Sequence, residues 1–206
     1  MSDFWNSLLT EKSWEILKEL RKEHNFILIG GWAAYLIAER QKSKDIDIVV
    51  DLNELHKLKQ ENIMGKNDKL RKYEIKKQDI DVDIYLEHYS KLAIPVEDIK
   101  NYTINLKGFN VACPELMIVL KQSAYFDRKD SVKGEKDLID IISILFFSEI
   151  DFEKYNDIIK KYSLENYLRS LYSAVSGFND FNKLNLSPKE FKLKKREILD
   201  KIRGVF

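Results

Sequence analysis

The chain has 206 residues, of which 44% are hydrophobic, so it can form one large or two small globular domains and is not a disordered chain. Its 35 lysines and arginines nearly balance 34 aspartates and glutamates, so the net charge singles out no class of partner. The single cysteine, Cys113, excludes an intramolecular disulfide and a cysteine-based zinc site, which is typical of cytoplasmic proteins.

No segment has the pattern of a targeting or membrane-spanning sequence. The N-terminal segment contains scattered acidic residues and lacks the basic stretch and apolar stretch of a signal peptide. The longest apolar run, Ile141–Phe147 with its flanks, is shorter than the ~18–20 residues that a membrane-spanning helix requires. We therefore expect a soluble, cytoplasmic protein without a membrane partner.

The N-terminal part alternates between helical and strand patterns. Apolar residues at helical spacing predict a helix, or a pair of helices, over Asp3–His24. Phe26–Ile29 is a continuous apolar run that ends at a glycine pair, which is typical of a buried strand, and Trp32–Arg40 is predicted to be a helix. A basic polar loop then leads to a second apolar strand that ends near Asp51.

Further strands follow along the chain. A short helix is predicted over Leu52–Met64 with Asn53 as its N-cap, and an exposed strand over Leu70–Lys77. In Asp79–Leu86 acidic and apolar residues alternate strictly, which is the period-two signature of a strand. Tyr102–Cys113 is expected to form a hairpin around a Lys-Gly turn.

From Pro114 onward the apolar period changes from two to about 3.6, so we place a domain boundary between residues 113 and 114. The last of the predicted helices begins with the Ser-Pro-x-Glu pattern of a capping box. Helices are predicted over Pro114–Arg128, Gly134–Phe147, Asp151–Tyr162, Ser163–Val175 and Ser187–Arg203, with a loop between the last two. The expected fold class is α+β, with a mixed β-sheet flanked by helices in residues 1–113 and a helical bundle in residues 114–206.

Two aspartates in the second strand carry the first chemical signal. Asp45 and Asp47 are two residues apart, so in a strand both side chains point to one face, roughly 7 Å from each other. Adjacent carboxylates in an apolar strand repel each other and lose hydration, and a divalent cation would relieve both costs. The alternative is a strand edge that faces water.

The alternating strand offers a third carboxylate for such a site. Asp79, Asp81 and Asp83 share its polar face. Beside the Asp45 and Asp47 pair, we expect this face to supply a metal ligand and not merely to be solvated.

Gly30 and Gly31 stand where a strand changes into a helix. Glycine lets backbone amides approach a ligand closely, and a helix N-terminus presents unpaired N–H groups and the positive end of its dipole. Phosphate is the expected ligand, and the alternative is a tight turn that binds nothing. Trp32 and Tyr35 on this helix are expected in the core, the alternative being a platform for base stacking.

This arrangement resembles the DNA polymerase beta-like nucleotidyltransferases. Residues 29–31, Ile-Gly-Gly, are similar to that family's motif of a hydrophobic residue, glycine, and glycine or serine. Residues 45–48, Asp-Ile-Asp-Ile, are similar to its motif of two acids that alternate with hydrophobic residues, and Asp83 is similar to its third carboxylate. Asp79 and Asp81 remain alternatives to Asp83, because they share its face.

The segment after Pro114 resembles the helical extension of toxin-type and antibiotic-modifying members, including the abortive-infection class of toxins. There, a lysine on the first helix after the sheet faces the nucleotide phosphates, and Lys121 is similar to it; the alternative is a solvated helix lysine. A lysine-aspartate element follows an arginine in those proteins. Residues similar to it are Arg128, Lys136, Asp137 and Asp140.

The loop before Asp45 departs from the family pattern. Family members often have a serine or threonine two residues before the first aspartate. They often have an arginine two residues before that serine or threonine. Here Ser43 is present but Gln41 stands at the arginine position, with Arg40 and Lys42 beside it. The basic contact that this loop would make with the substrate is therefore an open question.

The resemblance implies magnesium-dependent transfer of a nucleoside monophosphate from an NTP to a hydroxyl acceptor. Asp45, Asp47 and Asp83 would be the catalytic residues and would hold two Mg²⁺ ions. The residues expected to bind the nucleotide are Gly30, Gly31, Trp32, Ser43, Lys44 and Lys121. The first alternative is a catalytically silent regulatory partner protein on the same fold, and the second is a structural metal-binding domain.

The acceptor is expected to be RNA, such as a tRNA end, a protein hydroxyl or a small molecule, and an antitoxin is an expected partner of the toxin version. Residues 183–203 carry eight lysines and arginines against three acids, so this helix would suit RNA phosphates; the alternative is a solvated face. His24, His56 and His88 lack the i, i+4 pairing of zinc sites and are expected to be surface or hydrogen-bonded residues.

Overall fold

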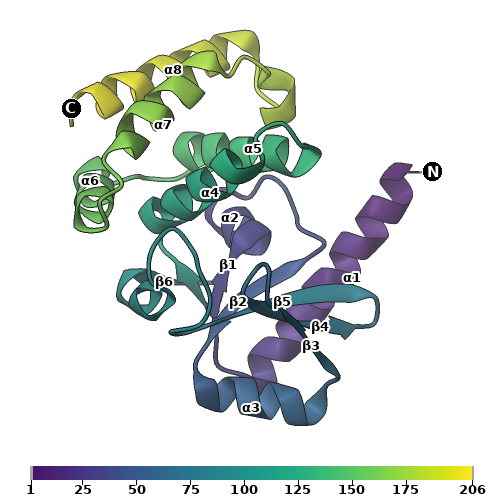
Figure 1. Ribbon diagram of the computed structural model, residues 1–206. Coiled ribbons are helices and arrows are strands. Elements are labelled where there is room, and N and C mark those ends of the chain that lie inside the picture. The colour runs from purple at the N-terminus through teal and green to yellow at the C-terminus, as the bar shows by residue number, and fades with distance from the viewer. Residues whose placement is uncertain (1, 206) are drawn as a thin grey trace. The chain divides into compact units, whose positions relative to one another are not determined.

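The computed structural model describes residues 2–205, with side chains from Ser7 to Val205 (Figure 1). The chain folds into two compact units. The first comprises the residues up to Leu36 together with Gln41–Cys113, and the second comprises Ile37–Arg40 together with the residues from Pro114 onward. The short segment Ile37–Arg40 thus belongs to the second unit although the first unit flanks it in sequence.

A seven-stranded mixed sheet lies in the first unit, in the order β3-β4-β5-β2-β1-β7-β6. β2 runs parallel to β5 and β1 parallel to β7, whereas the other neighbouring strands are antiparallel. The strands are β1 (Ile27–Ile29), β2 (Ile46–Val50), β3 (Met64–Asn67), β4 (Lys72–Lys77), β5 (Ile80–Leu86), β6 (Thr103–Leu106) and β7 (Phe109–Ala112). A mixed sheet with flanking helices confirms the α+β class.

The alternation in β5 decides which face of this strand is buried. Ile80, Val82 and Ile84 are buried, whereas Asp81 is exposed and Asp83 is half-buried. Burial of each aliphatic side chain contributes about 1.5–3 kcal/mol, and a register shift of one residue would turn the aspartates into the core. The apolar face therefore fixes the register of β5 and, with it, the position of Asp83.

The helices of the first unit are α1 (Ser2–Glu23), α2 (Gly30–Ala38), α3 (Leu52–Glu61) and the 3₁₀ helix η1 (Val96–Tyr102). α1 is one continuous helix that contacts β5, and its Ile16, Leu17 and Leu20 are buried. The spacing of these residues places them on one face of the helix. α1 therefore contributes its apolar face to the core of this unit.

Two sequence predictions around α3 were wrong. The N-cap is Asp51 and not Asn53, because the Asp51 carboxylate accepts a hydrogen bond from the Glu54 backbone N–H at 2.8 Å. Met64 belongs to β3 and not to the helix. Its strand, Met-Gly-Lys-Asn, has no apolar alternation, so nothing in its own pattern marks it as a strand.

The second unit is helical. The Ser187 hydroxyl accepts a bond from the Glu190 N–H, and the Glu190 carboxylate accepts from the Ser187 N–H, so the predicted capping box is confirmed. A 3₁₀ turn, η2, occupies part of the segment predicted to be a loop. The elements are α4 (Pro114–Arg128), α5 (Val132–Phe147), α6 (Phe152–Lys161), α7 (Asn166–Gly177), η2 (Phe181–Leu184) and α8 (Pro188–Arg203).

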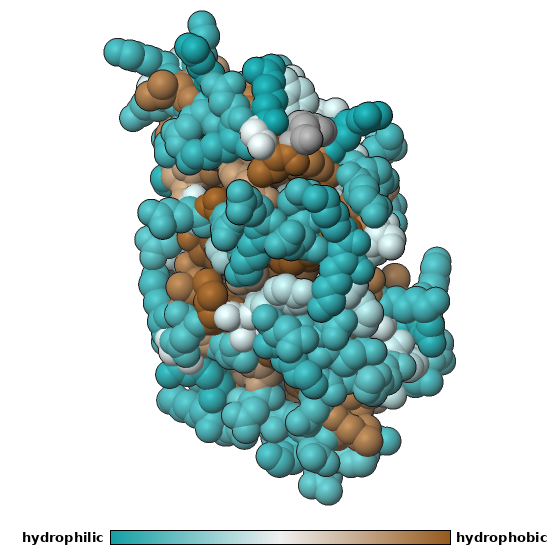
Figure 2. Space-filling model, turned by 90° about the vertical axis from the view of Figure 1, so that its left-hand side faces the viewer, coloured by the Kyte–Doolittle hydropathy of each residue, from teal (hydrophilic) through white to brown (hydrophobic). Residues whose placement is uncertain are grey.

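Hydrophilic side chains cover most of the face drawn in Figure 2, and hydrophobic ones appear in separate patches. Within residues 2–205, none of the helices combines the length and the apolar character that crossing a bilayer demands.

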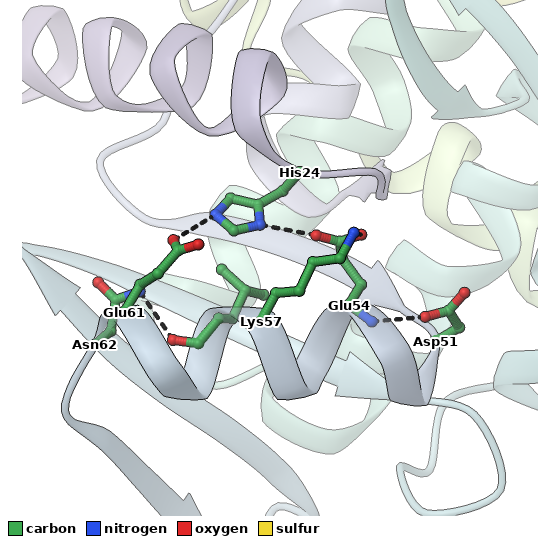
Figure 3. Close-up of polar contacts among 7 residues, drawn as sticks. His24, Asp51, Glu54, Lys57, Glu61 and Asn62 are labelled. Carbon is green, nitrogen blue, oxygen red and sulfur yellow. Dashed lines mark hydrogen bonds and ion pairs between the residues drawn. The ribbon is translucent and has the colours of Figure 1, made fainter.

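A buried histidine joins the end of α1 to α3 (Figure 3). His24 Nδ1 lies 2.8 Å from Glu54 Oε1, and its Nε2 lies 3.0 Å from Glu61 Oε2. His24 therefore lies between one carboxylate on the first turn of α3 and one at the end of that helix. The His24 side chain is fully buried and that of Glu54 is 5% exposed. This arrangement fits the expectation of a hydrogen-bonded histidine.

We expect His24→Ala to lower the free energy of unfolding by about 1–3 kcal/mol, because it removes a buried hydrogen-bond partner of Glu54 and leaves Lys57, 3.3 Å away, beside that carboxylate. Urea denaturation at neutral pH would measure the loss. His56→Ala is the matched control, because His56 is exposed on α3 and its removal should change stability by less than about 0.5 kcal/mol. Equal effects of the two substitutions would contradict this interpretation of His24.

Candidate active site

Asp47 and Asp83 lie side by side at the centre of the sheet. They are register partners in the parallel pair formed by β2 and β5. Since side chains alternate along strands, partners in register point to the same face. Asp45 directly precedes β2, so the three predicted catalytic aspartates lie in two neighbouring segments. The structure thus brings Asp83 to the acid pair, although it is distant from the pair in sequence.

Gly30 packs directly against Asp47. Ile29 is the antiparallel partner of Asp47, so the next residue, Gly30, begins α2 beside that carboxylate. Gly30 has φ +68°, and a Cβ on it would lie 2.0 Å from Asp47 Oδ2. Only glycine combines this backbone conformation with the space that the carboxylate needs. The start of α2 and the acid pair therefore form one site.

Lys72 on β4 completes this group and was missed by the sequence analysis. Its Nζ lies 2.5 Å from Asp83 Oδ2 and 3.1 Å from Glu74 Oε1, and its side chain is only 10% exposed. Glu74 is the register partner of Asp83, and Lys72 precedes it by two residues on the same face of β4. The alternation of Lys72 and Glu74 was a usable signal, but the pairing of β4 with β5 was not evident from sequence.

The surroundings of Asp83 favour a positive charge beside it. Burial raises the pKa of Asp83 to about 6 and the negative charge of Asp47 adds to the rise, although the hydrogen bond from Lys72 opposes it. Burial by itself would lower the pKa of Lys72, but the ion pairs with Asp83 and Glu74 raise it above its usual value. Lys72 therefore supplies a positive charge beside this buried carboxylate.

The two alternative ligands, Asp79 and Asp81, are not in register with Asp47. Asp79 is in the turn before the strand, with φ +72°, and its carboxylate lies 3.6 Å from Lys12 Nζ. Asp81 is exposed and its register partner is Lys76 on β4. Asp83 is the β5 residue in register with Asp47 and is the best candidate for the third carboxylate.

The other nucleotide-binding candidates of the first unit lie at the two ends of α2. Gly31 and Trp32 are buried on its first turn. The Trp32 indole N–H donates to Ser13 Oγ at 2.8 Å, so this ring is fixed in the core as expected. Ser43 is buried and Lys44 exposed in the loop that leads to Asp45.

Lys121 lies on α4 in the second unit and is buried, so it is not a solvated helix lysine. Its Nζ lies 3.1 Å from Asp137 Oδ1 and 2.7 Å from Asp140 Oδ2. Arg128 Nε lies 2.8 Å from the other oxygen of Asp137. These four residues of the lysine-aspartate pattern thus form one ion cluster that joins α4 to α5.

Several basic residues of α8 bond to other parts of the second unit. Lys194 Nζ donates to the Phe146 carbonyl at 2.7 Å, and Lys195 Nζ donates to the carbonyls of Ser176 and Phe178 at 2.7 and 2.8 Å. Burial lowers the pKa of Lys195. These lysines stabilise the C-terminal ends of α5 and α7, where unpaired carbonyls accumulate. Lys194 and Lys195 therefore have structural contacts within the second unit.

Among the described residues, the His24 region also holds a compact set of metal-binding groups. Glu23, His24 and Glu61 bring one ligand atom each within 4.8 Å of one another. Both nitrogens of His24 already bond to carboxylates, so we assign this set to the hydrogen bonds described above. The aspartates around Gly30 are the better candidate for a catalytic metal site.

No protein-family model and no curated protein matches the chain. Among solved structures, it is similar to a candidate nucleotidyltransferase from H. pylori, with 20% identity, 98% of each chain covered and a TM-score of 0.48. It is similar to JHP933 from Helicobacter pylori, with 20% identity, 97% and 94% covered and a TM-score of 0.43. The antibiotic-resistance factor ANT(2'')-Ia follows, with 18% identity, 84% and 96% covered and a TM-score of 0.43. These TM-scores are below 0.5, so the proposed function rests on the geometry of the site.

We expect Gly30→Ala to destabilise the protein by about 1–3 kcal/mol, because alanine is strained at this positive φ and its Cβ would collide with Asp47. Chemical denaturation would measure the change. Gly177→Ala is the matched control, because a Cβ there meets no atom within 4 Å, and the helix preference of alanine should leave stability equal or up to about 1 kcal/mol higher. A Gly30→Ala protein as stable as the control would refute the close contact with Asp47.

Proposed function

We propose that the chain is a magnesium-dependent nucleotidyltransferase that moves a nucleoside monophosphate from an NTP to a hydroxyl acceptor. The single observation that carries this proposal is the register of Asp47 with Asp83 beside the glycine that opens α2. It combines a carboxylate pair, which suits a divalent cation, with a helix N-terminus, which suits phosphate. In this proposal the first unit is the catalytic domain and the second is its helical extension.

The residues around Asp47 fit magnesium ions. Asp45, Asp47 and Asp83 would hold two of them, since Mg²⁺ prefers carboxylates together with water and phosphate oxygens. Burial and the negative charge of Asp47 raise the pKa of Asp83, so added positive charge would stabilise its carboxylate. When bound, the ions would lower the pKa of the acceptor hydroxyl and neutralise the departing pyrophosphate.

The chain's own groups would position the NTP. The backbone N–H groups of Gly30 and Gly31 at the start of α2 would bind phosphate oxygens, and the helix dipole would favour their charge. Ser43 and Lys44 would add contacts from the loop before Asp45. Trp32 would act indirectly, because its buried ring fixes the first turn of α2 through Ser13. The resemblance assigns a phosphate contact to Lys121, whose ammonium bonds to Asp137 and Asp140 within the second unit.

The proposed acceptor belongs to one of three classes, namely RNA, a protein hydroxyl or a small molecule. A toxin would also have an antitoxin as its partner. The resemblance in the lysine-aspartate pattern supports the toxin version, whereas the internal bonds of Lys194 and Lys195 weaken the case for RNA on α8. We also propose a cytoplasmic location, which the buried Cys113 supports.

One observation favours the alternative of a catalytically silent partner protein. The Lys72 ammonium lies 2.5 Å from Asp83, where a metal ion would bind in an active enzyme. A silent protein would keep this ion pair permanently. An active enzyme would have to displace Lys72 when the metal binds.

We expect Asp47→Asn and Asp83→Asn each to lower nucleotide transfer by about 100–1,000-fold, the loss typical of removing a group that stabilises transition-state charge. Transfer of a labelled nucleotide from each of the four NTPs to cellular RNA and protein would measure this. Asp81→Asn is the matched control, because Asp81 is exposed on the same strand and should leave transfer unchanged. A loss with Asp81→Asn but not with Asp83→Asn would reverse the assignment of the third carboxylate.

We expect Mg²⁺ to raise the melting temperature of Lys72→Met more than that of the unmodified protein, because the ammonium and the metal ion repel each other. Lys76→Met, an exposed lysine of the same strand, should respond like the unmodified protein. Thermal melts at increasing Mg²⁺ would show this without any assay of activity. Mg²⁺ without effect on all three proteins would support the silent alternative.

A further inference from the structure

An aromatic recess lies on the flank of α2, within the first unit. Its volume is about 260 Å³, which is close to the lower end of the range for small-molecule sites. Two helices, α1 and α2, and two loops contribute aromatic, aliphatic and basic side chains to it. The lining residues are Trp14, Trp32, Tyr35, Leu36, Lys42 and Lys107.

The aromatic wall of this recess is held in place. Trp32 is fixed by its hydrogen bond to Ser13, and its ring centroid lies 5.0 Å from that of Trp14. Tyr35 meets Trp32 edge to face, with centroids 5.5 Å apart. Trp14 and Tyr35 are partly exposed, so their rings are accessible to a flat ligand. A rigid aromatic wall binds a planar ring without loss of side-chain freedom.

Among the described residues that line the recess, the charged ones are Lys42 and Lys107, and both are positive. Lys107 lies in the turn between β6 and β7, and Arg21 fixes that turn to α1 by donating to the Lys107 carbonyl at 2.9 Å. The same guanidinium stacks over Phe109, 4.8 Å from the ring centroid. Lys42 is exposed on the loop after α2. The ligand that complements this lining is a planar ring with a negative charge beside it.

The recess adjoins the candidate active site along the chain. α2 begins at Gly30, against Asp47, and carries Trp32 to Leu36 within about 10 Å along its axis, at 1.5 Å per residue. Lys42 stands in the loop that leads to Asp45. The recess nevertheless has its own pair of lysines, separate from the backbone N–H groups that open α2. It therefore offers a phosphate position distinct from the one at the helix start.

We propose that this recess binds one nucleotide unit of the acceptor, with its base against Trp14 and Tyr35 and its phosphate between Lys42 and Lys107. Base stacking on aromatic side chains and phosphate pairing with lysines are the usual means of holding single-stranded nucleic acid. Nucleotide binding follows from the recess alone, whereas the role as acceptor rests on the proposed nucleotidyl transfer. The substrate class would then be an RNA or nucleotide end.

The experiment titrates the full chain with AMP in the absence of Mg²⁺, by calorimetry and tryptophan fluorescence. Adenosine and ribose 5-phosphate are the comparison probes, because each retains only one half of the ligand. We expect AMP to bind about tenfold or more tightly than either probe and to quench the fluorescence. Absence of AMP binding, or equal binding of AMP and ribose 5-phosphate, would overturn the proposal.

Variants locate the bound nucleotide. Lys42→Gln combined with Lys107→Asn should weaken AMP about tenfold and reduce the salt dependence of its binding, with adenosine unaffected; asparagine suits the positive φ of position 107. The matched control is Lys133→Gln with Lys189→Gln, two exposed lysines outside the recess, and it should bind AMP normally. Trp14→Leu should remove the advantage of AMP over ribose 5-phosphate. A lysine pair variant that binds AMP as well as its control would overturn the proposal.

Asp47→Asn separates this inference from the proposed function. The variant should bind AMP in the recess with unchanged affinity, because Asp47 lies at the candidate metal site. Binding that requires Mg²⁺ and disappears in Asp47→Asn would place AMP at the NTP site and would overturn the proposal. Normal AMP binding in a protein that transfers no nucleotide would support the recess and refute only the nucleotidyl transfer.

Discussion

The half-buried carboxylates of Asp47 and Asp83, in register on neighbouring parallel strands, are the constraint on which the rest of the first unit depends. Two like charges at this spacing are tolerated only where the surroundings offer room and compensating charge. Gly30 gives Asp47 its room, because any side chain at that position would collide with the carboxylate. Lys72 gives Asp83 its counter-charge from the adjacent antiparallel strand. Asp47, Asp83 and Lys72 lie on three different strands, and Gly30 opens α2. The site therefore forms only when these elements have assembled.

Local patterns predicted most of the fold. The alternation in Ile80–Leu86 and the change of apolar period at Pro114 both report local burial, and the corresponding strand and helix formed as expected. Prediction failed where the deciding interaction was not local. β3 forms because its backbone pairs with β4, although its side chains carry no strand pattern. Asp51 replaced the predicted cap Asn53 because either residue type suits an N-cap, and only the geometry of the helix start decides between them.

The candidate site was predictable in part for the same reason. Asp47 and Gly30 lie within short motifs, so their spacing in sequence indicated their roles. The burial of Lys72 results from the register of β4 against β5, and the alternation of Lys72 with Glu74 did not reveal that pairing. Likewise, the ion pairs of Lys121 and the carbonyl bonds of Lys195 depend on helix packing. Composition identified these lysines as positive charges and could not identify their partners.

The parallel pairing of β1 with β7 has a consequence for the order in which the protein folds. Leu28 pairs with Val111 at the far end of the same unit, so β1 acquires this neighbour only after the chain between them has closed a long loop. Contacts between residues distant in sequence form slowly, whereas helices built from local contacts form quickly. During synthesis, the edge of β1 that faces away from β2 and the acid pair therefore stays open until β7 has emerged. The strands that carry Asp47 and Asp83 emerge before β7, so the candidate site can assemble while this side of the sheet is still incomplete.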